Sequence, residues 1–434
     1  MSAVIAPAEG APPRPPLSRD LRTISVVSIA HSGSHFCQLM VPPLFPWIAP
    51  EFGLSNTQLG LLMSVFFVVS GFGQAFAGFV VDRHGPERVL FGGLALLALA
   101  ALGLGASPSY ATLLVFMAMA GLGNCVFHPV DFSILNARVH STRLGHAYAA
   151  HGISGSLGWA LAPVFVVGIA ALSSWRTALF VVSGAVSLLL VLMLWQRASL
   201  GVPRVAPGGA ASKAAGEALG TGAAAAQGNV ESKFDFLRLP AVWACFGFFF
   251  IFAAALGGLQ SFAPAAASKM HGISTEQVAL CLSAYMVCGA AGMVLGGQLL
   301  RDPRRTALVA GCGFGFAALV ALVIGFGSWP AAWVPVLCGV MGVGSGIAGP
   351  SRDLLVKQAT PPGATGRVYG VVYSGLDAGL VVAPLLFGAL MDAGLFRAVW
   401  LGVALLFALL IVTALNVKRA APKAAAAAAA VGAT

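Results

Sequence analysis

Charged residues are scarce in this sequence. Only 9% of its 434 residues are Asp, Glu, Lys or Arg, whereas soluble globular proteins contain about 25%. Hydrophobic residues make up 58% of the chain, and 54 residues are glycine. So few charges could not cover a water-facing surface, which excludes a soluble enzyme, a nucleic-acid-binding protein and a disordered protein. The composition predicts a polytopic membrane protein.

Cysteine pairs at metal-binding spacing are also missing. The seven cysteines lie in apolar stretches and none belongs to a Cys-x-x-Cys pair, so neither a disulfide framework nor a cysteine zinc cluster is indicated. The first 22 residues lack the apolar core of a signal peptide. A nucleotide-binding loop is absent as well, so we expect neither ATP-driven transport nor an enzyme, and no cofactor.

Twelve stretches are long and apolar enough to span a bilayer, which takes about 20 residues. They are about 24–49, 57–80, 89–107, 111–137, 145–172 and 177–196, then about 240–264, 275–300, 305–327, 331–354, 367–390 and 395–417. We therefore predict an all-α membrane protein with twelve transmembrane helices in two six-helix halves. The expected parts are a tail (1–23), the N-terminal half (24–196), a Gly/Ala-rich linker (197–238), the C-terminal half (239–417) and a second tail (418–434).

Basic residues indicate how the chain is oriented, because Lys and Arg are retained on the cytoplasmic side. With both termini cytoplasmic, all but three of the 24 Lys and Arg residues fall on that side. The exceptions are Arg176, Lys269 and Arg397. The net charge of +10 is therefore a topology signal, and no nucleic-acid partner is expected.

The two halves are related in sequence. At an offset of 219 residues, Gly53, Ser55, Gln58, Ser64, Gly73 and Gly78 match Gly272, Ser274, Gln277, Ser283, Gly292 and Gly297. At an offset of 221, Gly121, Gly123, Pro129, Gly145, Tyr148, Gly158 and Pro163 match Gly342, Gly344, Pro350, Gly366, Tyr369, Gly379 and Pro384. Both Ser-x-x-Gln pairs precede apolar runs, as capping boxes do. Repeated halves related by a pseudo-two-fold axis are typical of secondary transporters, whose substrate sites lie between the halves.

The stretch between the second and third segments carries a motif. Residues 78–88 read GFVVDRHGPER, which resembles the G-x-x-x-D-R-x-G-x-x-R signature of the major facilitator superfamily. The resemblance implies the major facilitator fold and a gating role for Gly78, Asp82, Arg83, Gly85 and Arg88. In that family the Asp braces the outward-facing state against the start of helix 11, here near Gly366, where a helix N-terminus stabilises a carboxylate. The alternative for the two Arg residues is that they only anchor the chain on the cytoplasmic side.

Further matches point to one subfamily. Residues 30–46 (AHSGSHFCQLMVPPLFP), 121–129 (GLGNCVFHP) and 152–163 (GISGSLGWALAP) look like the fosmidomycin-resistance family of drug efflux proteins. That family has a His in helix 1, an FHP sequence in helix 4 and a glycine-rich helix 5. The chain departs from the pattern at His35, where an acidic residue is expected one turn after His31. It also has Met117 and Ala118 where many facilitator proteins carry a basic residue in helix 4.

The first segment has a polar face. Ser28, His31, His35 and Gln38 follow at spacings of three, four and three, which places them on one side of a helix. Ionisable groups inside a bilayer usually face a cavity, so we interpret this face as binding substrate or protons. The alternative is a polar contact between helices. A metal ion held by two His one turn apart is a third interpretation, which we do not favour because no carboxylate is clearly placed to help.

Helices 4, 5 and 11 supply the other candidates. His128 precedes Pro129, which removes a helical hydrogen bond. One interpretation of Asp131 is that it only pairs with Arg138 at the helix mouth. Asp377 is the one carboxylate expected near the midplane, where it suits proton coupling. The alternative for Asp377 is a structural hydrogen bond. The candidate substrate or proton residues are His31, His35, Gln38, His128, Tyr148, His151, Tyr373 and Asp377.

These observations predict a proton-coupled secondary transporter of the bacterial inner membrane. We expect it to export a small polar or anionic compound, such as an antibiotic, because protonated imidazoles attract anions. The alternative is a proton symporter that takes up a small organic acid. We expect small-molecule substrate, protons and lipid as partners, no metal and no cofactor, and a monomer.

Overall fold

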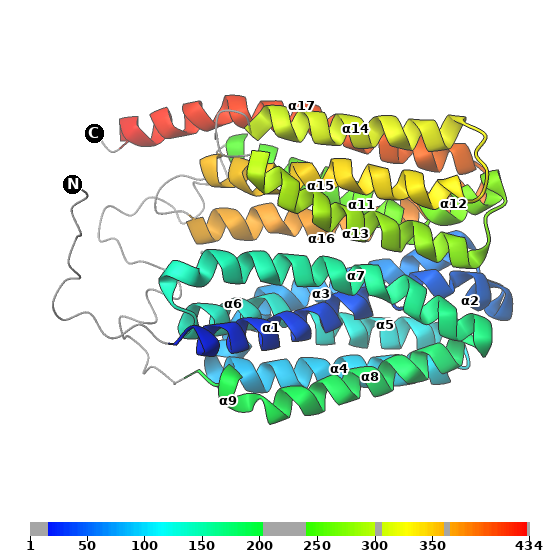
Figure 1. The fold of residues 1–434 in the computed structure, drawn as a ribbon, viewed down its shortest axis with the longest axis horizontal. Coiled ribbons are helices and arrows are strands. Elements are labelled where there is room, and N and C mark those ends of the chain that lie inside the picture. Colours follow the sequence, from blue (N-terminus) through cyan, green and yellow to red (C-terminus); the bar gives the residue numbers. More distant parts are fainter. Residues whose placement is uncertain (1–15, 203–239, 300–305, 360–364, 432–434) are drawn as a thin grey trace.

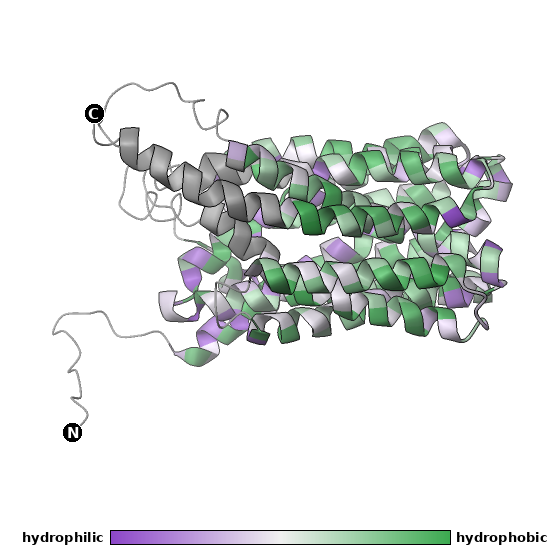
Figure 2. Cartoon of the chain, turned by 90° about the horizontal axis from the view of Figure 1, so that it is seen from above, coloured by the Kyte–Doolittle hydropathy of each residue, from purple (hydrophilic) through white to green (hydrophobic). Residues whose placement is uncertain are grey.

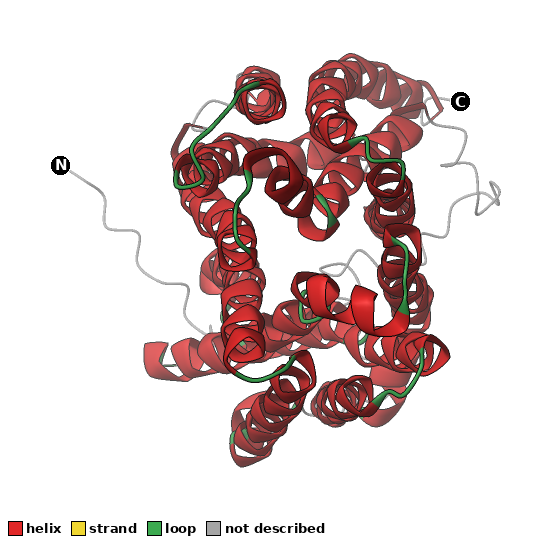
Figure 3. Cartoon of the chain, turned by 90° about the vertical axis from the view of Figure 1, so that its right-hand side faces the viewer, coloured by secondary structure: helices red, strands yellow, loops and turns green. Residues whose placement is uncertain are grey.

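The structure is a computed structural model and describes residues 16–202, 240–299, 306–359 and 365–431. Within these ranges it describes all side chains except those of 241, 352–359, 365–371, 373 and 415–431. The described chain contains helices and no strand (Figure 3). Most of the predicted linker lies outside these residues.

Two groups of helices follow one another along the chain. The first group consists of α1 (Leu17–Gln38), η1 (Pro42–Leu44), α2 (Phe45–Phe52), α3 (Asn56–His84), α4 (Pro86–Ala106), α5 (Tyr110–Asn124), α6 (Phe127–Arg138), η2 (Ser141–Arg143), α7 (Leu144–Leu172), α8 (Trp175–Trp195) and α9 (Arg197–Leu200). The second consists of α11 (Pro240–Ser261), α12 (Ala263–His271), α13 (Thr275–Leu299), α14 (Thr306–Phe326), α15 (Trp333–Ala359), α16 (Thr365–Asp392) and α17 (Phe396–Val431). The predicted all-α membrane fold is confirmed.

Eleven helical segments among the described residues are long and apolar enough to cross a membrane, and Figure 2 shows that hydrophobic residues predominate along the bundle. The remaining predicted segment is the first, 24–49, which the structure divides into α1, η1 and α2. Helix α1 packs along α7 (Figure 1). It has 22 residues, which is about 33 Å at 1.5 Å per residue. Helix α1 is less apolar than the other eleven segments because it carries Asp20, Thr23, His31, His35 and Gln38, all of which are buried.

The two ends of the bundle differ in charge. We call the end with the start of α1 and with α9 the proximal end, and the end with α2 and α12 the distal end (Figure 1). Arg176, Lys269 and Arg397, the three basic residues predicted to lie opposite the others, are all at the distal end. Arg176 pairs there with Glu51 of α2, and Lys269 lies on α12.

The sequence repeat is visible in matching turns. Gly53 and Gly272 end α2 and α12 with φ angles of 62° and 66°, a left-handed conformation that favours glycine. The next helix begins in each half with a capping box, because Ser55 and Gln58 exchange hydrogen bonds, as do Ser274 and Gln277. The repeat therefore places corresponding helices in corresponding orientations.

The halves contact each other at the distal end. The Asp392 carboxylate at the end of α16 accepts hydrogen bonds from the backbone N–H groups of Asn56 (2.7 Å) and Thr57 (2.9 Å) and from both of their side chains. It thereby caps the free N–H groups at the start of α3. On the other side of the bundle, Ser283 of α13 donates to the backbone oxygen of Ala160 in α7, at 2.6 Å.

Candidate functional site

Two glycines bring α7 close to α1. A Cβ atom at Gly155 would lie 2.8 Å from ring atoms of His35 and 3.1 Å from Nε2 of His31. A Cβ atom at Gly158 would lie 2.2 Å from the backbone oxygen of Ser32. Atoms in a close-packed interior do not approach so closely without displacement. The glycine-rich helix 5 recognised in the sequence therefore makes room for the two imidazoles of α1.

The fourth predicted span is interrupted, and the interruption positions two site residues. Helix α5 ends at Asn124 and α6 begins at Phe127, so Pro129 lies in the first turn of α6, where a missing N–H removes no helical bond. His128 is in the same turn, and Asp131 follows three residues later on the same face. Both side chains reach α1, since His128 and Asp131 each contact His31.

Asp131 joins imidazoles from two helices. Its Oδ2 lies 2.9 Å from Nδ1 of His31 and 3.0 Å from Nε2 of His151. The rings of these two His stack with their centroids 3.5 Å apart, and the Asp131 side chain has no exposed surface. A buried carboxylate has to be paired, and the two imidazoles pair this one.

The predicted pairing of Asp131 with Arg138 is wrong. The Arg138 guanidinium donates instead to the backbone oxygen of Gly201 at the proximal end, about two helical turns from Asp131. Arg138 was predicted as the partner because it is the nearest Lys or Arg to Asp131 along the helix. This prediction overlooked that Asp131 shares a face with His128, so the predicted site lacked its carboxylate.

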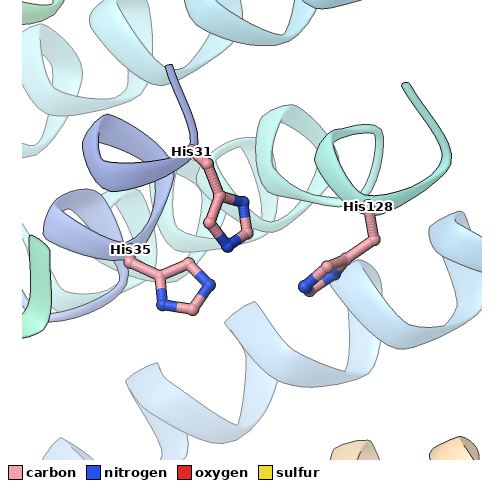
Figure 4. Close-up of side chains that lie close together, drawn as sticks. All are labelled: His31, His35 and His128. Carbon is pink, nitrogen blue, oxygen red and sulfur yellow. The ribbon is translucent and has the colours of Figure 1, made fainter. Parts of the chain in front are cut away.

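His35 and His128 complete the cluster, and Figure 4 shows their rings converging with that of His31. The ring centroids of His31 and His35 are 4.4 Å apart, and those of His31 and His128 are 5.3 Å apart. Nδ1 of His128 lies 3.0 Å from Oε1 of Gln74 on α3. His35 is 8% exposed, and neither of its ring nitrogens has a hydrogen-bond partner in the described part of the chain. Gln74 was not among the residues predicted for the site. Its amide is a lone polar group in an apolar stretch of α3, which is the signal that could have identified it.

Gln38 belongs to a second polar network beside the cluster. Its amide group donates to Oδ1 of Asn124 (3.2 Å) and accepts from Nε1 of Trp159 (2.9 Å). Asn124 in turn donates to Ser70 at 2.9 Å. The Trp159 ring lies 4.3 Å from that of His35, centroid to centroid. Gln38 thus holds Trp159 against the cluster, and its own polar atoms are already bonded.

Two other predicted residues, Tyr148 and Asp377, stand apart from the cluster. Tyr148 donates to Asn136 near the proximal end. Asp377 of α16 lies against α3, where a Cβ atom at Gly71 would be 2.9 Å from its Cβ and 3.2 Å from its Oδ2. The side chain of Tyr373 is outside the described set. Asp377 therefore marks a contact between the two halves.

The predicted gating residues surround the turn between α3 and α4. Gly85 separates these helices with a φ angle of 87°, in the region that favours glycine. A Cβ atom at Gly78 would meet nothing within 4 Å. Asp82, Arg83 and Arg88 are exposed. The side chains around Gly366, the predicted neighbour of Asp82, lie outside the described ones.

A cavity of about 410 Å³ lies at the distal end, between η1, α2, α7, α11, α12 and α13. Its walls include Phe45, Phe262, Leu282 and Gln260. The His cluster does not line it. Two overlapping groups in the cluster bring possible metal ligands within 4.8 Å of one another: His31, His35 and His128, and His31, Asp131 and His151.

A bundle of membrane-spanning helices in two related halves, with an ionisable cluster in one of them, is the architecture of a multi-pass membrane protein. The chain belongs to the Major Facilitator Superfamily, whose family model matches residues 27–373. This membership agrees with the motif at residues 78–88.

Similar proteins include transporters of different kinds. The chain is 28% identical over 156 residues to the fosmidomycin resistance protein of Escherichia coli, a match covering 34% of this chain and 36% of that protein. It is 32% identical over 143 residues to a probable sulfoacetate transporter of Cupriavidus necator, a match covering 33% of each chain. These matches span about a third of the relatives. A solved bacterial homolog of the human lysosomal transporter Spinster, in an inward-facing and occupied conformation, has a TM-score of 0.69 at 15% identity and covers 92% of this chain and 96% of its own.

Proposed function

We propose that this protein is a proton-coupled secondary transporter that exports a small polar or anionic compound, an antibiotic or a metabolite, across the bacterial inner membrane. The observation that carries the proposal is the group of four imidazoles beside Asp131, three of them buried and His128 half-buried. The name of the fosmidomycin resistance protein supports efflux of a drug. The probable sulfoacetate transporter supports an anion as substrate, and it also favours the second candidate, proton symport of a small organic acid into the cell.

The unpaired nitrogens of His35 support an anionic or polar substrate. A buried polar group without a partner costs about 1–3 kcal/mol, and a substrate oxygen that accepts an imidazole N–H removes that penalty. His151 is held by a hydrogen bond with Asp131, and His31 lies beside the same carboxylate. Close contact with the tilted ring of Trp159 limits the movement of His35. The cluster thus offers a donor that is fixed in place before substrate arrives.

Proton coupling is assigned to Asp377. This carboxylate lies where α16 meets α3, and among the described side chains no titratable or charged group contacts it. A negative charge in such a contact is costly in a membrane, so protonation favours the packed arrangement and deprotonation favours its separation. This dependence would link the proton gradient to the movement of the halves.

Access to the site is proposed from the proximal end, which we take as cytoplasmic. The halves are joined at the distal end by Asp392, Asn56 and Thr57, and Asp82 is the proposed gate residue of the opposite state. Impermeant thiol reagents should label His271→Cys in whole cells but not Lys213→Cys, in a background without native cysteines. The reverse pattern would invert the orientation. Asp82→Asn should slow transport at normal expression, and a wild-type rate would remove Asp82 from the gate.

Reconstituted transport separates coupling from binding. Purified protein in liposomes should accumulate a substrate from a panel of anionic drugs and metabolites only under an imposed pH gradient. The Asp377→Asn variant should lose this accumulation and keep passive exchange of the same substrate. Gradient-driven accumulation by Asp377→Asn at the wild-type rate would contradict the assignment of coupling.

A further inference from the structure

We propose that His31, His35 and His128 bind a divalent transition-metal ion of the zinc class. The proposal goes beyond transport, because binding can be measured on the purified protein without a gradient or a substrate. It also reverses the expectation from the sequence. That expectation rested on the lack of a carboxylate near the histidines, and Asp131 supplies one.

The three ligand nitrogens are already close together. One ring nitrogen of each His lies within 4.8 Å of the others, and the rings converge from α1 and α6 in Figure 4. Tetrahedral zinc with Zn–N bonds of about 2.0–2.1 Å needs ligand nitrogens about 3.4 Å apart. Small rotations of the side chains would bring the nitrogens to this separation, and no helix would have to move.

One of the three imidazoles is oriented as a metal ligand is, and a second lies beside a carboxylate. A ligating His usually donates its second N–H to a carboxylate or carbonyl oxygen, which fixes the ring and the tautomer. Nδ1 of His128 lies 3.0 Å from the amide oxygen of Gln74 in a hydrogen bond. Nδ1 of His31 lies 2.9 Å from Asp131 without hydrogen-bond geometry, and a small rotation of the ring would align its N–H with the carboxylate. In both rings Nε2 is then left with a lone pair for a metal ion.

His35 supplies the third ligand. Its burial is also an independent reason to expect a bound metal ion. His35 is 92% buried by its 8% exposure, and neither ring nitrogen makes a hydrogen bond of good geometry within the described structure, where the backbone of Gly155 is the polar group beside the ring. A metal ion would satisfy one of these nitrogens. Because only three imidazoles converge, a fourth position stays open for water or for an anionic substrate, the arrangement found in zinc sites that bind ligands.

The ligand set selects the class of ion. Imidazole nitrogen suits zinc, copper, nickel and cobalt, whereas Mg²⁺ and Ca²⁺ prefer oxygen ligands. A bound dication would also add the positive charge that neutral imidazoles lack. An anionic substrate would then be held more tightly when the ion is present.

The test is metal binding by chelator-treated protein in detergent micelles, purified with a tag that contains no histidine. Titration calorimetry with Zn²⁺ should show one equivalent per chain, and Co²⁺ should give the visible absorption bands of a tetrahedral site. The His35→Gln/His128→Gln variant should bind at least about 100-fold more weakly, since even loss of a second-shell partner typically costs 10–100-fold. His146→Gln, at an exposed position of α7, is the matched control and should bind as the wild type does.

Gln74→Leu keeps all three ligands and removes only the oxygen behind His128. It should bind Zn²⁺ about 10–100-fold more weakly, which also tests the proposal if the double variant does not fold. Absence of saturable Zn²⁺ binding to wild-type protein, or equal affinity in wild type and Gln74→Leu, would overturn the proposal. Wild-type protein that transports under a pH gradient but shows no saturable Zn²⁺ binding would overturn the metal site alone and leave the proposed function standing.

Discussion

The two halves of the molecule share a scaffold but not a site. Capping boxes, glycine turns and interrupted first helices recur in both. The residues of the cluster do not. At the offsets of 219 and 221 residues that relate the halves, His31, His35, His128, Asp131 and His151 correspond to Phe250, Ala254, Gly349, Arg352 and Val372.

This difference separates two demands on the sequence. Helix packing and turns have to be kept in both halves for the halves to move as similar bodies, whereas binding chemistry is needed once. The polar pair Tyr285–Ser345 in the C-terminal half, at 2.8 Å, is buried and mutually satisfied, in contrast to His35. The N-terminal half is therefore the half in which substitutions should change affinity.

The largest effect is expected from His31→Gln/His35→Gln. Glutamine keeps one donor but cannot reproduce the imidazole geometry, and hydrogen bonds to charged groups contribute about 1.5–3 kcal/mol. Substrate affinity in reconstituted liposomes should fall at least about tenfold. Tyr285→Phe removes a buried hydroxyl from the other half and should change affinity less than about threefold. Equal losses of substrate affinity in the two variants would contradict the assignment of binding to the N-terminal half.

A smaller loss should follow Gly155→Ala. The added methyl group meets the His35 ring at 2.8 Å, and overpacking of this kind typically destabilises by about 1–3 kcal/mol. We expect lower thermal stability together with weaker substrate binding. The control is Gly152→Ala, one turn away on α7, where a Cβ atom would meet nothing within 4 Å. If both alanine variants melt at the wild-type temperature, α1 does not depend on Gly155 for its position.

The contact between the halves can be weakened at Asp392. Its carboxylate caps the start of α3, and such caps contribute about 0.5–2 kcal/mol, so Asp392→Ala should raise the population with an open distal end about 2- to 30-fold. The alkylation rate of a cysteine at Gln260, which lines the distal cavity, reports this opening. Glu276→Ala, at the start of the corresponding helix α13, serves as the comparison. An unchanged alkylation rate in Asp392→Ala would show that the contact does not hold this end closed.

The smallest effect is expected at Glu51, which joins α2 to α8 within the N-terminal half. Desolvation opposes its charge, but hydrogen bonds from Trp175 (2.6 Å) and Arg176 (2.5 Å) outweigh it and lower the pKa of Glu51. Because its pKa is lowered in the folded state, charged Glu51 stabilises the fold at pH values above its ordinary pKa of 4.5. This contribution is lost as the pH falls below that value. Glu51→Gln should therefore lower stability at pH 7 by about 0.2–1 kcal/mol, as exposed pairs do. The difference from wild type should shrink near pH 4 in thermal melts, and a constant difference would exclude a role for the charge.

The sequence predicted the fold well because the spans and the repeat follow from local rules. Apolar length, capping boxes and glycine turns act within a few residues, and the structure confirms them at Ser55, Gln58 and Gly53. It also placed His31, His35, His128 and His151 as candidates. It missed their arrangement around Asp131, because that depends on a helix interruption at residues 125–126 and on the rotation of α6 against α1. Neither is encoded in spacing alone.

The polarity of α1 has a consequence for how the protein is made. This helix is the predicted span that is not among the eleven described segments apolar enough to cross a membrane. Within the described structure its buried His31 lies against Asp131 of α6 and His151 of α7. A nascent chain therefore exposes α1 to lipid before its partners, about 100 residues later, have left the ribosome. We expect stable insertion of α1 to wait for α6 and α7. Glycosylation mapping of chains truncated before and after residue 172 would reveal the delay as a shift from partial to complete insertion.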